Sequence, residues 1–215
     1  KMADDTAILY VTDRPDIVME RGRGMYLRDS EGRRYLDFIG GWAVDCLGHS
    51  PRAVHRALAR QSRRLVNASP SFYNVEMLAY AAELVTETCL DRVWFGSSGA
   101  EANEAAVKLA RKYGSLHKDG AYEVITTENS FHGRTLAMMN ATGKAHWHGL
   151  FDPKPSGFIH VPFNDLEAVA GAINLVEDRD GGIAGADEIG VQGMADAVLD
   201  RAVGGDERLS DDLAA

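Results

Sequence analysis

The sequence is poor in cysteine, in long apolar runs and in basic clusters, and each shortage excludes a class of protein. Cys46 and Cys89 are the only cysteines among 215 residues, too few for a disulfide framework. No run approaches the ~18 apolar residues of a membrane span, and the N-terminus lacks the basic-then-apolar pattern of a signal peptide. No basic stripe interleaved with aromatic residues suggests nucleic acid. We therefore expect a cytoplasmic protein with neither membrane nor nucleic-acid partners.

Acidic charge is concentrated at the C-terminal end. The formal net charge is −9, and residues 174–215 hold 11 Asp and Glu residues against three arginines, with no lysine and no aromatic residue. This change in composition predicts a boundary near Ile173 and Asn174. We expect three regions: an N-terminal arm with a small antiparallel segment (1–50), an α/β ligand-binding domain (51–173) and an acidic, divergent tail with little ordered structure (174–215).

The most informative stretch is residues 92–104, where a short apolar run gives way to glycine and serine and then to alanines at helical spacing. Ser98 can cap the first turn of the helix, and Glu101, three residues later, can complete a capping box. Gly99 has no Cβ, so a ligand can approach its backbone closely. Free N–H groups and the helix dipole favour a phosphate there, although an ordinary capped helix has the same pattern.

Other segments predict alternating strands and helices. Strands are expected at 25–28, 33–38, 92–95, 122–127 and 158–161, and helices at 50–66 with Ser50 as its cap, 74–88, 98–117 and 164–173. The 98–117 helix should pack on a sheet through a face of small residues: Ala102, Ala105, Ala106, Leu109, Ala110 and Tyr113. This order favours a mostly parallel α/β sheet, which binds ligands beyond the C-terminal ends of its strands.

A loop directly after the 122–127 strand should lie at the same edge of the sheet as Ser98. Within residues 129–135, Phe131 has an aromatic face on which a ring can stack, and His132 can accept or donate a proton. Arg134 can bind a carboxylate through two hydrogen bonds. A turn with a packed Phe131 and a solvated Arg134 remains an equally good interpretation of the loop alone. His146 and His148, two residues apart with no cysteine or carboxylate beside them, make a poor zinc site.

Taken together, these residues resemble the N-terminal half of a class III aminotransferase, the fold-type I pyridoxal-phosphate group, and most of all its acetylornithine-type enzymes. The resemblance covers roughly residues 8–173 and implies an incomplete, mostly parallel three-layer sheet. A Rossmann-type nucleotide site is a poorer match, because the Gly-x-Gly-x-x-Gly spacing is missing. The motifs that carry the resemblance occur in the family's order: Tyr35-Leu36-Asp37-Phe38, Leu47-Gly48-His49-Ser50-Pro51, Ser98-Gly99-Ala100-Glu101-Ala102-Asn103-Glu104 and Phe131-His132-Gly133-Arg134-Thr135.

The resemblance also implies roles for individual residues. The cofactor would be pyridoxal 5'-phosphate, with its phosphate on Ser98, Gly99 and Ala100. Phe131 would stack on its ring, with His132 as a nearby support. Arg134 would bind a substrate carboxylate, and Trp42 falls in a segment close to the substrate. The implied partners are an amino acid, a 2-oxo acid and a second copy of the chain in a homodimer.

One catalytic group implied by the family has no counterpart in the sequence. The family's lysine holds the cofactor as a Schiff base, but no lysine here stands in a matching context, so no catalytic residue is identified. The family's aspartate motif has only a partial likeness around Asp187 and Glu188. We therefore expect a truncated transaminase with little activity alone, or a non-catalytic fragment that binds a phosphate ligand weakly or pairs with a complete subunit.

Overall fold

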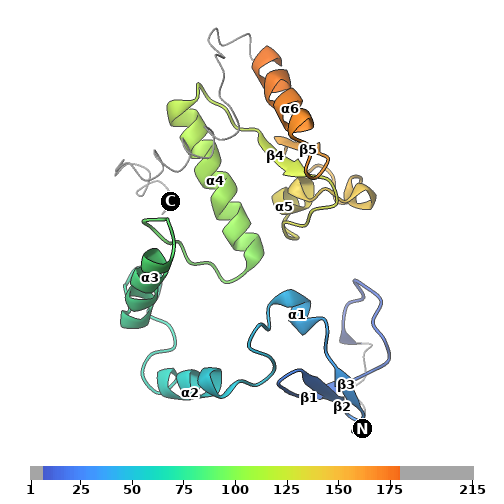
Figure 1. Ribbon diagram of the computed structural model, residues 1–215, viewed down its shortest axis with the longest axis vertical. Coiled ribbons are helices and arrows are strands. Elements are labelled where there is room, and N and C mark those ends of the chain that lie inside the picture. Colours follow the sequence, from blue (N-terminus) through green and yellow to red (C-terminus); the bar gives the residue numbers. More distant parts are fainter. Residues whose placement is uncertain (1–6, 180–215) are drawn as a thin grey trace. The chain divides into compact units, whose positions relative to one another are not determined.

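The computed structural model describes residues 7–179, with the side chains of 174–179 left out, and it divides after Val75 into two compact units (Figure 1). No helix of the described part is long and apolar enough to cross a membrane. Most of the expected acidic tail lies outside the described residues, and the expected boundaries at 50 and 173 stay predictions.

The first unit contains a three-stranded antiparallel sheet of β1 (Met19–Arg23), β2 (Tyr26–Asp29) and β3 (Arg34–Leu36). The predicted hairpin of β2 and β3 is confirmed. The prediction of an irregular arm up to residue 24 is wrong, because β1 pairs along β2. Its polar side chains lack the alternation typical of a strand, so the backbone ladder rather than side-chain burial holds it in the sheet.

Asp29 is the buried polar centre of this sheet. Its carboxylate accepts hydrogen bonds from the backbone N–H of Arg33 at 2.8 Å, from Arg33 Nε at 2.7 Å and from the Tyr35 hydroxyl at 2.8 Å. Burial alone would raise the pKa of Asp29, but these donors outweigh it and lower the pKa to about 2. The turn between β2 and β3 is thus closed around a carboxylate.

Two short helices follow, α1 (Gly40–Ala43) and α2 (Arg52–Gln61). The helix predicted from 50 to 66 is shorter than expected, and Pro51, not Ser50, occupies the N-cap position. Ser50 has a φ of 52°, which is incompatible with the predicted capping conformation. Leu58 in this helix is 64% exposed, and α2 has no buried residue.

The second unit is an α/β unit that α3 (Val75–Glu87) opens. It continues with α4 (Gly99–His117), β4 (Val124–Thr127), α5 (Leu136–Ala141), η2 (Ala145–Trp147), β5 (Phe158–Val161) and α6 (Leu166–Arg179). Strands β4 and β5 pair in parallel from Val124 with Phe158 to Thr127 with Val161. The core lies around them, with Met138, Met139, Ala141, Val161 and Ala172 buried. The predicted α/β class, the parallel pairing and the bounds of α4 are confirmed.

Two predictions for this unit are wrong. Residues 92–95 are extended but form no strand, because β4 and β5 are the only strands of the unit's described part and neither pairs with them. The expected inner face of α4 is only partly covered: Ala105 and Tyr113 are half-buried, but Ala102, Ala106, Leu109 and Ala110 are exposed. The last helix also runs to Arg179, past the expected end at 173.

Candidate functional site

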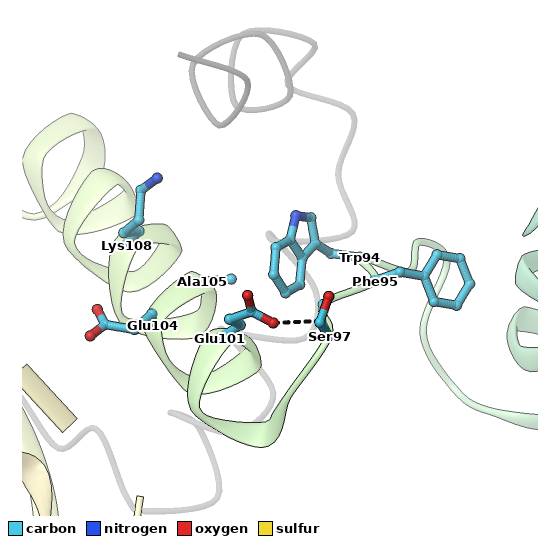
Figure 2. Close-up of a pocket in the computed structure, with 8 residues that line it drawn as sticks. Trp94, Phe95, Ser97, Glu101, Glu104, Ala105 and Lys108 are labelled. Carbon is cyan, nitrogen blue, oxygen red and sulfur yellow. Dashed lines mark hydrogen bonds between the residues drawn. The ribbon is translucent and has the colours of Figure 1, made fainter. Parts of the chain in front are cut away.

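The start of α4 has the capped geometry that the sequence predicts. Ser98 is extended, with φ −152° and ψ 160°, and its side chain accepts a hydrogen bond from the backbone N–H of Glu101 at 3.2 Å. The capping box is displaced by one residue, because the Glu101 carboxylate accepts from the N–H of Ser97 at 2.5 Å and not from that of Ser98 (Figure 2). The turn before the helix is therefore closed on both sides of Ser98.

Gly99 and Ala100 leave this helix start open to a ligand. The geometry of an α-helix gives the N–H groups of its first residues no acceptor inside the helix. A Cβ built on Gly99 would meet no protein atom within 4 Å, so packing does not explain the glycine. The free space beside the N–H groups fits an anion such as the phosphate of pyridoxal phosphate.

The loop of residues 129–135 lies directly against this helix start. A Cβ on Gly133 would stand 2.7 Å from the Cβ of Ala100, and the φ of Gly133 is 137°. The Asn103 side chain donates a hydrogen bond of 2.7 Å to the carbonyl oxygen of His132, and the Thr135 hydroxyl donates to the Glu104 carboxylate. The two sequence motifs therefore lie side by side, joined by one close backbone contact and two hydrogen bonds.

His132 is held inside the loop. Its N–H donates to the hydroxyl of the fully buried Thr142 at 3.0 Å, and its Nδ1 lies 3.4 Å from the Ser130 hydroxyl. Burial, and then the charge of His160, lower the pKa of His132 below its ordinary value. His132 is therefore a neutral imidazole at neutral pH, which suits the supporting role predicted for it.

Phe131 and Arg134 reach outward from the same loop. Phe131 is 56% exposed and makes an edge contact with Trp147, with the ring centroids 5.9 Å apart. Arg134 Cζ lies 5.2 Å from the Trp147 ring centroid, and Lys144 Nζ lies 5.1 Å from it. Sequence reasoning missed Trp147 and Lys144 as parts of this cluster. It weighed the segment around Trp147 only as a zinc site and Lys144 only as a cofactor anchor.

Trp42 belongs to the first unit, whereas the loop residues belong to the second. It lies in α1 of the first unit, with a φ of 64°, and it is 89% exposed. Its predicted place near the substrate stays a prediction, as do the roles assigned to the residues of the second unit.

A separate open hollow of about 330 Å³ lies on another side of the α4 start (Figure 2). Figure 2 shows the indole of Trp94 turned toward α4 and the ring of Phe95 turned the other way, where it stacks on Tyr80. Glu101, Glu104 and Lys108 line the hollow, so it carries two acidic groups and one basic group. Since none of Ser98, Gly99 and Ala100 lines it, it is not the predicted phosphate site.

A parallel α/β unit with an open helix start beside a loop that carries an exposed phenylalanine and an arginine is the arrangement expected of a pyridoxal-phosphate-dependent transaminase. The chain belongs to the class III aminotransferases, whose family model matches residues 10–179.

Curated relatives support the same assignment. Acetylornithine aminotransferase 2 of Bordetella bronchiseptica is 49% identical over 168 residues, which are 78% of this chain and 42% of that protein. Acetylornithine aminotransferase of Ralstonia nicotianae is 50% identical over 171 residues, or 78% of this chain and 43% of that protein. The chain thus spans about two-fifths of the length of these relatives.

Solved structures show the same fold. Ornithine aminotransferase of Toxoplasma gondii, determined with PLP partially occupying its active site, matches with a TM-score of 0.74 at 28% identity and covers 79% of this chain and 41% of that one. An (S)-enantioselective omega-transaminase of Thermomicrobium roseum matches with a TM-score of 0.71 at 28% identity, over 82% of this chain and 45% of that one.

Proposed function

We propose that this chain carries the phosphate-binding and ring-stacking part of an aminotransferase that moves an amino group from an ω-amino acid, such as N2-acetylornithine, to 2-oxoglutarate. The names of the curated relatives support the donor. The observation that carries the proposal is the close approach of Gly133 to Ala100, which holds the loop with Phe131 and Arg134 against the open start of α4.

Each residue has one task in this proposal. The backbone N–H groups of Gly99 and Ala100, beside Ser98, bind the phosphate at the positive end of the helix dipole. The exposed ring of Phe131 stacks on the pyridine ring, and Arg134 binds a substrate carboxylate by a two-pronged contact. When bound, pyridoxal phosphate supplies the electron sink for transamination, and the protein supplies binding and orientation.

We further infer little turnover by this polypeptide alone. Transamination in this family also needs a lysine that anchors the cofactor and moves a proton. The six lysines of the sequence stand in other contexts: Lys1, Lys108, Lys112, Lys118, Lys144 and Lys154. Covalent attachment of the cofactor to any of them after borohydride reduction would contradict this inference.

A second candidate function is non-catalytic, as a weak binder of phosphate ligands or a partner of a complete subunit. The exposure of Ala102, Ala106 and Ala110 on α4, together with Trp94, favours it, because such a face suits another protein surface. Co-purification with a complete aminotransferase would support this candidate, whereas an active, monodisperse homodimer would exclude it. If the chain instead acts as part of a catalytic aminotransferase, we propose that the enzyme is a cytoplasmic homodimer.

A Gly99→Ala variant tests the phosphate site. Because its Cβ meets no protein atom, we expect an unchanged melting temperature. It should weaken binding of pyridoxal phosphate roughly tenfold, about 1.4 kcal/mol, because the new methyl group would occupy space through which the phosphate approaches the retained backbone N–H groups. Binding of pyridoxal, which has no phosphate, should stay within about twofold by the same fluorescence titration.

Gly171→Ala in α6 is the matched control, because its Cβ also meets nothing within 4 Å and it lies outside the loop and the start of α4. If Gly99→Ala and the unmodified chain bind pyridoxal phosphate equally well, the phosphate does not bind at the start of α4.

A further inference from the structure

Two cations converge on one aromatic ring at the edge of the candidate site. Arg134 Cζ and Lys144 Nζ both lie within 5.2 Å of the Trp147 ring centroid, so their separation cannot exceed twice that distance. Lys144 Nζ also lies 5.5 Å from the Phe131 ring centroid. Within the described part of the chain neither cation has an acidic partner. With no ion pair to neutralise them, two positive charges around one ring attract the anionic groups of a ligand.

The backbone fixes Lys144 at this place. Gly143, the residue before it, forms a parallel bridge with Glu128 just beyond β4, and its carbonyl oxygen accepts from the N–H of Asn129 at 2.7 Å. A Cβ at Gly143 would stand 2.2 Å from the carbonyl oxygen of Thr127, so only glycine allows this approach. Lys144 therefore starts at the C-terminal edge of the parallel sheet, where α/β proteins bind their ligands.

Aromatic contact also limits the freedom of the two cations. A cation over a ring face gains about 0.5–1 kcal/mol at an exposed site, which favours the observed positions over extended, solvated ones. Trp147 and Lys144 are half-buried, so the Lys144 charge is less screened than on an open surface, whereas Arg134 is exposed. The cluster therefore presents two ordered positive charges next to the ring-stacking Phe131.

We propose that Lys144 is a specificity-determining residue that binds a second carboxylate, so that Arg134 and Lys144 together select a short dicarboxylic acid. The proposal rests on the function proposed above, and it assigns to Lys144 the second carboxylate of the 2-oxo dicarboxylic acid named there. Arg134 holds one carboxylate by its planar fork, and Lys144 holds the other as a point charge. A phosphate has its own place at the start of α4, so two separate carboxylates are the better fit for this cluster.

The test is calorimetric titration of the full chain, without cofactor, with glutarate and with butyrate, which has the same carbon chain and one carboxylate fewer. We expect the unmodified chain to bind glutarate roughly tenfold more tightly, because a second charged hydrogen bond contributes about 1.5–3 kcal/mol. Lys144→Gln should abolish that preference while butyrate binding is unchanged. Lys144→Arg, which keeps the charge, should retain most of it.

Lys118→Gln is the matched control, since Lys118 is an exposed lysine at the opposite end of α4 from Ser98. Circular dichroism of each variant checks the fold. The proposal is overturned if the unmodified chain does not prefer glutarate, if Lys144→Gln weakens both ligands equally, or if Lys118→Gln has the same effect. Failure of the proposed function would instead appear as absent pyridoxal phosphate binding, with the ratio of glutarate to butyrate affinity preserved.

Discussion

Replacing Gly133 by alanine should push the loop of residues 129–135 away from the start of α4. The new methyl group would stand 2.7 Å from the Cβ of Ala100 and 3.1 Å from its Cα, and the backbone has a φ of 137°. Overpacking costs about 1–3 kcal/mol, and a strained backbone adds a further ~1–3 kcal/mol. Because 1 kcal/mol changes the melting temperature of a chain of this length by roughly 2–4 °C, the loss should be easy to measure.

Gly120→Ala separates the two costs. Gly120 also has a positive φ, 90°, but a Cβ there meets nothing within 4 Å, so this variant has the backbone strain without the collision. We expect Gly133→Ala to melt well below Gly120→Ala and to bind pyridoxal phosphate more weakly. Only the second effect depends on the proposed site.

A double variant tests the contact itself. Ala100→Gly removes the atom nearest the new methyl group, so Ala100→Gly combined with Gly133→Ala should regain part of the lost stability. If Gly133→Ala melts like Gly120→Ala, or if Ala100→Gly gives no rescue, the loop is not held against α4 in the way described here.

Two further predictions concern the support of the loop. Thr142→Val leaves the N–H of His132 without its acceptor and should cost about 1–3 kcal/mol in thermal unfolding, whereas Thr142→Ser keeps the hydroxyl and should cost less; equal losses would argue against the hydrogen bond. The pKa of His132 is lowered in the folded chain, so the unfolded chain binds more protons below about pH 6.5. Stability should therefore be full above that pH and fall as the pH drops below it, and His132→Gln should flatten this dependence in melts across pH 5–8; an unchanged slope would contradict the assignment.

Local signals predict the elements that need no distant partner. Helix α4 begins and ends where the sequence indicates, because its cap, Ser98, and the residue it binds, Glu101, are three positions apart. The strand predicted at 92–95 fails for the opposite reason, since a strand exists only beside another strand. Strand β1 was missed because its partner, not its own pattern, makes it a strand.

Some residues of the candidate site can likewise be predicted from the sequence, and others cannot. Phe131, His132 and Arg134 stand in one short motif, so their closeness follows from the sequence alone. Lys144 and Trp147 join them only because Gly143 returns the chain to the end of β4. The available signal was a glycine directly before the lysine together with a tryptophan three residues later, and neither residue suggests a partner ten positions earlier.

The attachment of α4 explains how a ligand would act on this fold. Polar groups supply part of this attachment: Arg111 donates to the carbonyl oxygens of Tyr122 at 3.1 Å and Ser156 at 2.6 Å, and Asn103 donates to that of His132. Each such bond contributes only about 0.5–1.5 kcal/mol, or somewhat more from a charged donor. A cofactor that contacts both the start of α4 and Phe131 would therefore link two weakly joined elements. Because it binds the folded chain and not the unfolded one, its binding would raise the free energy of unfolding.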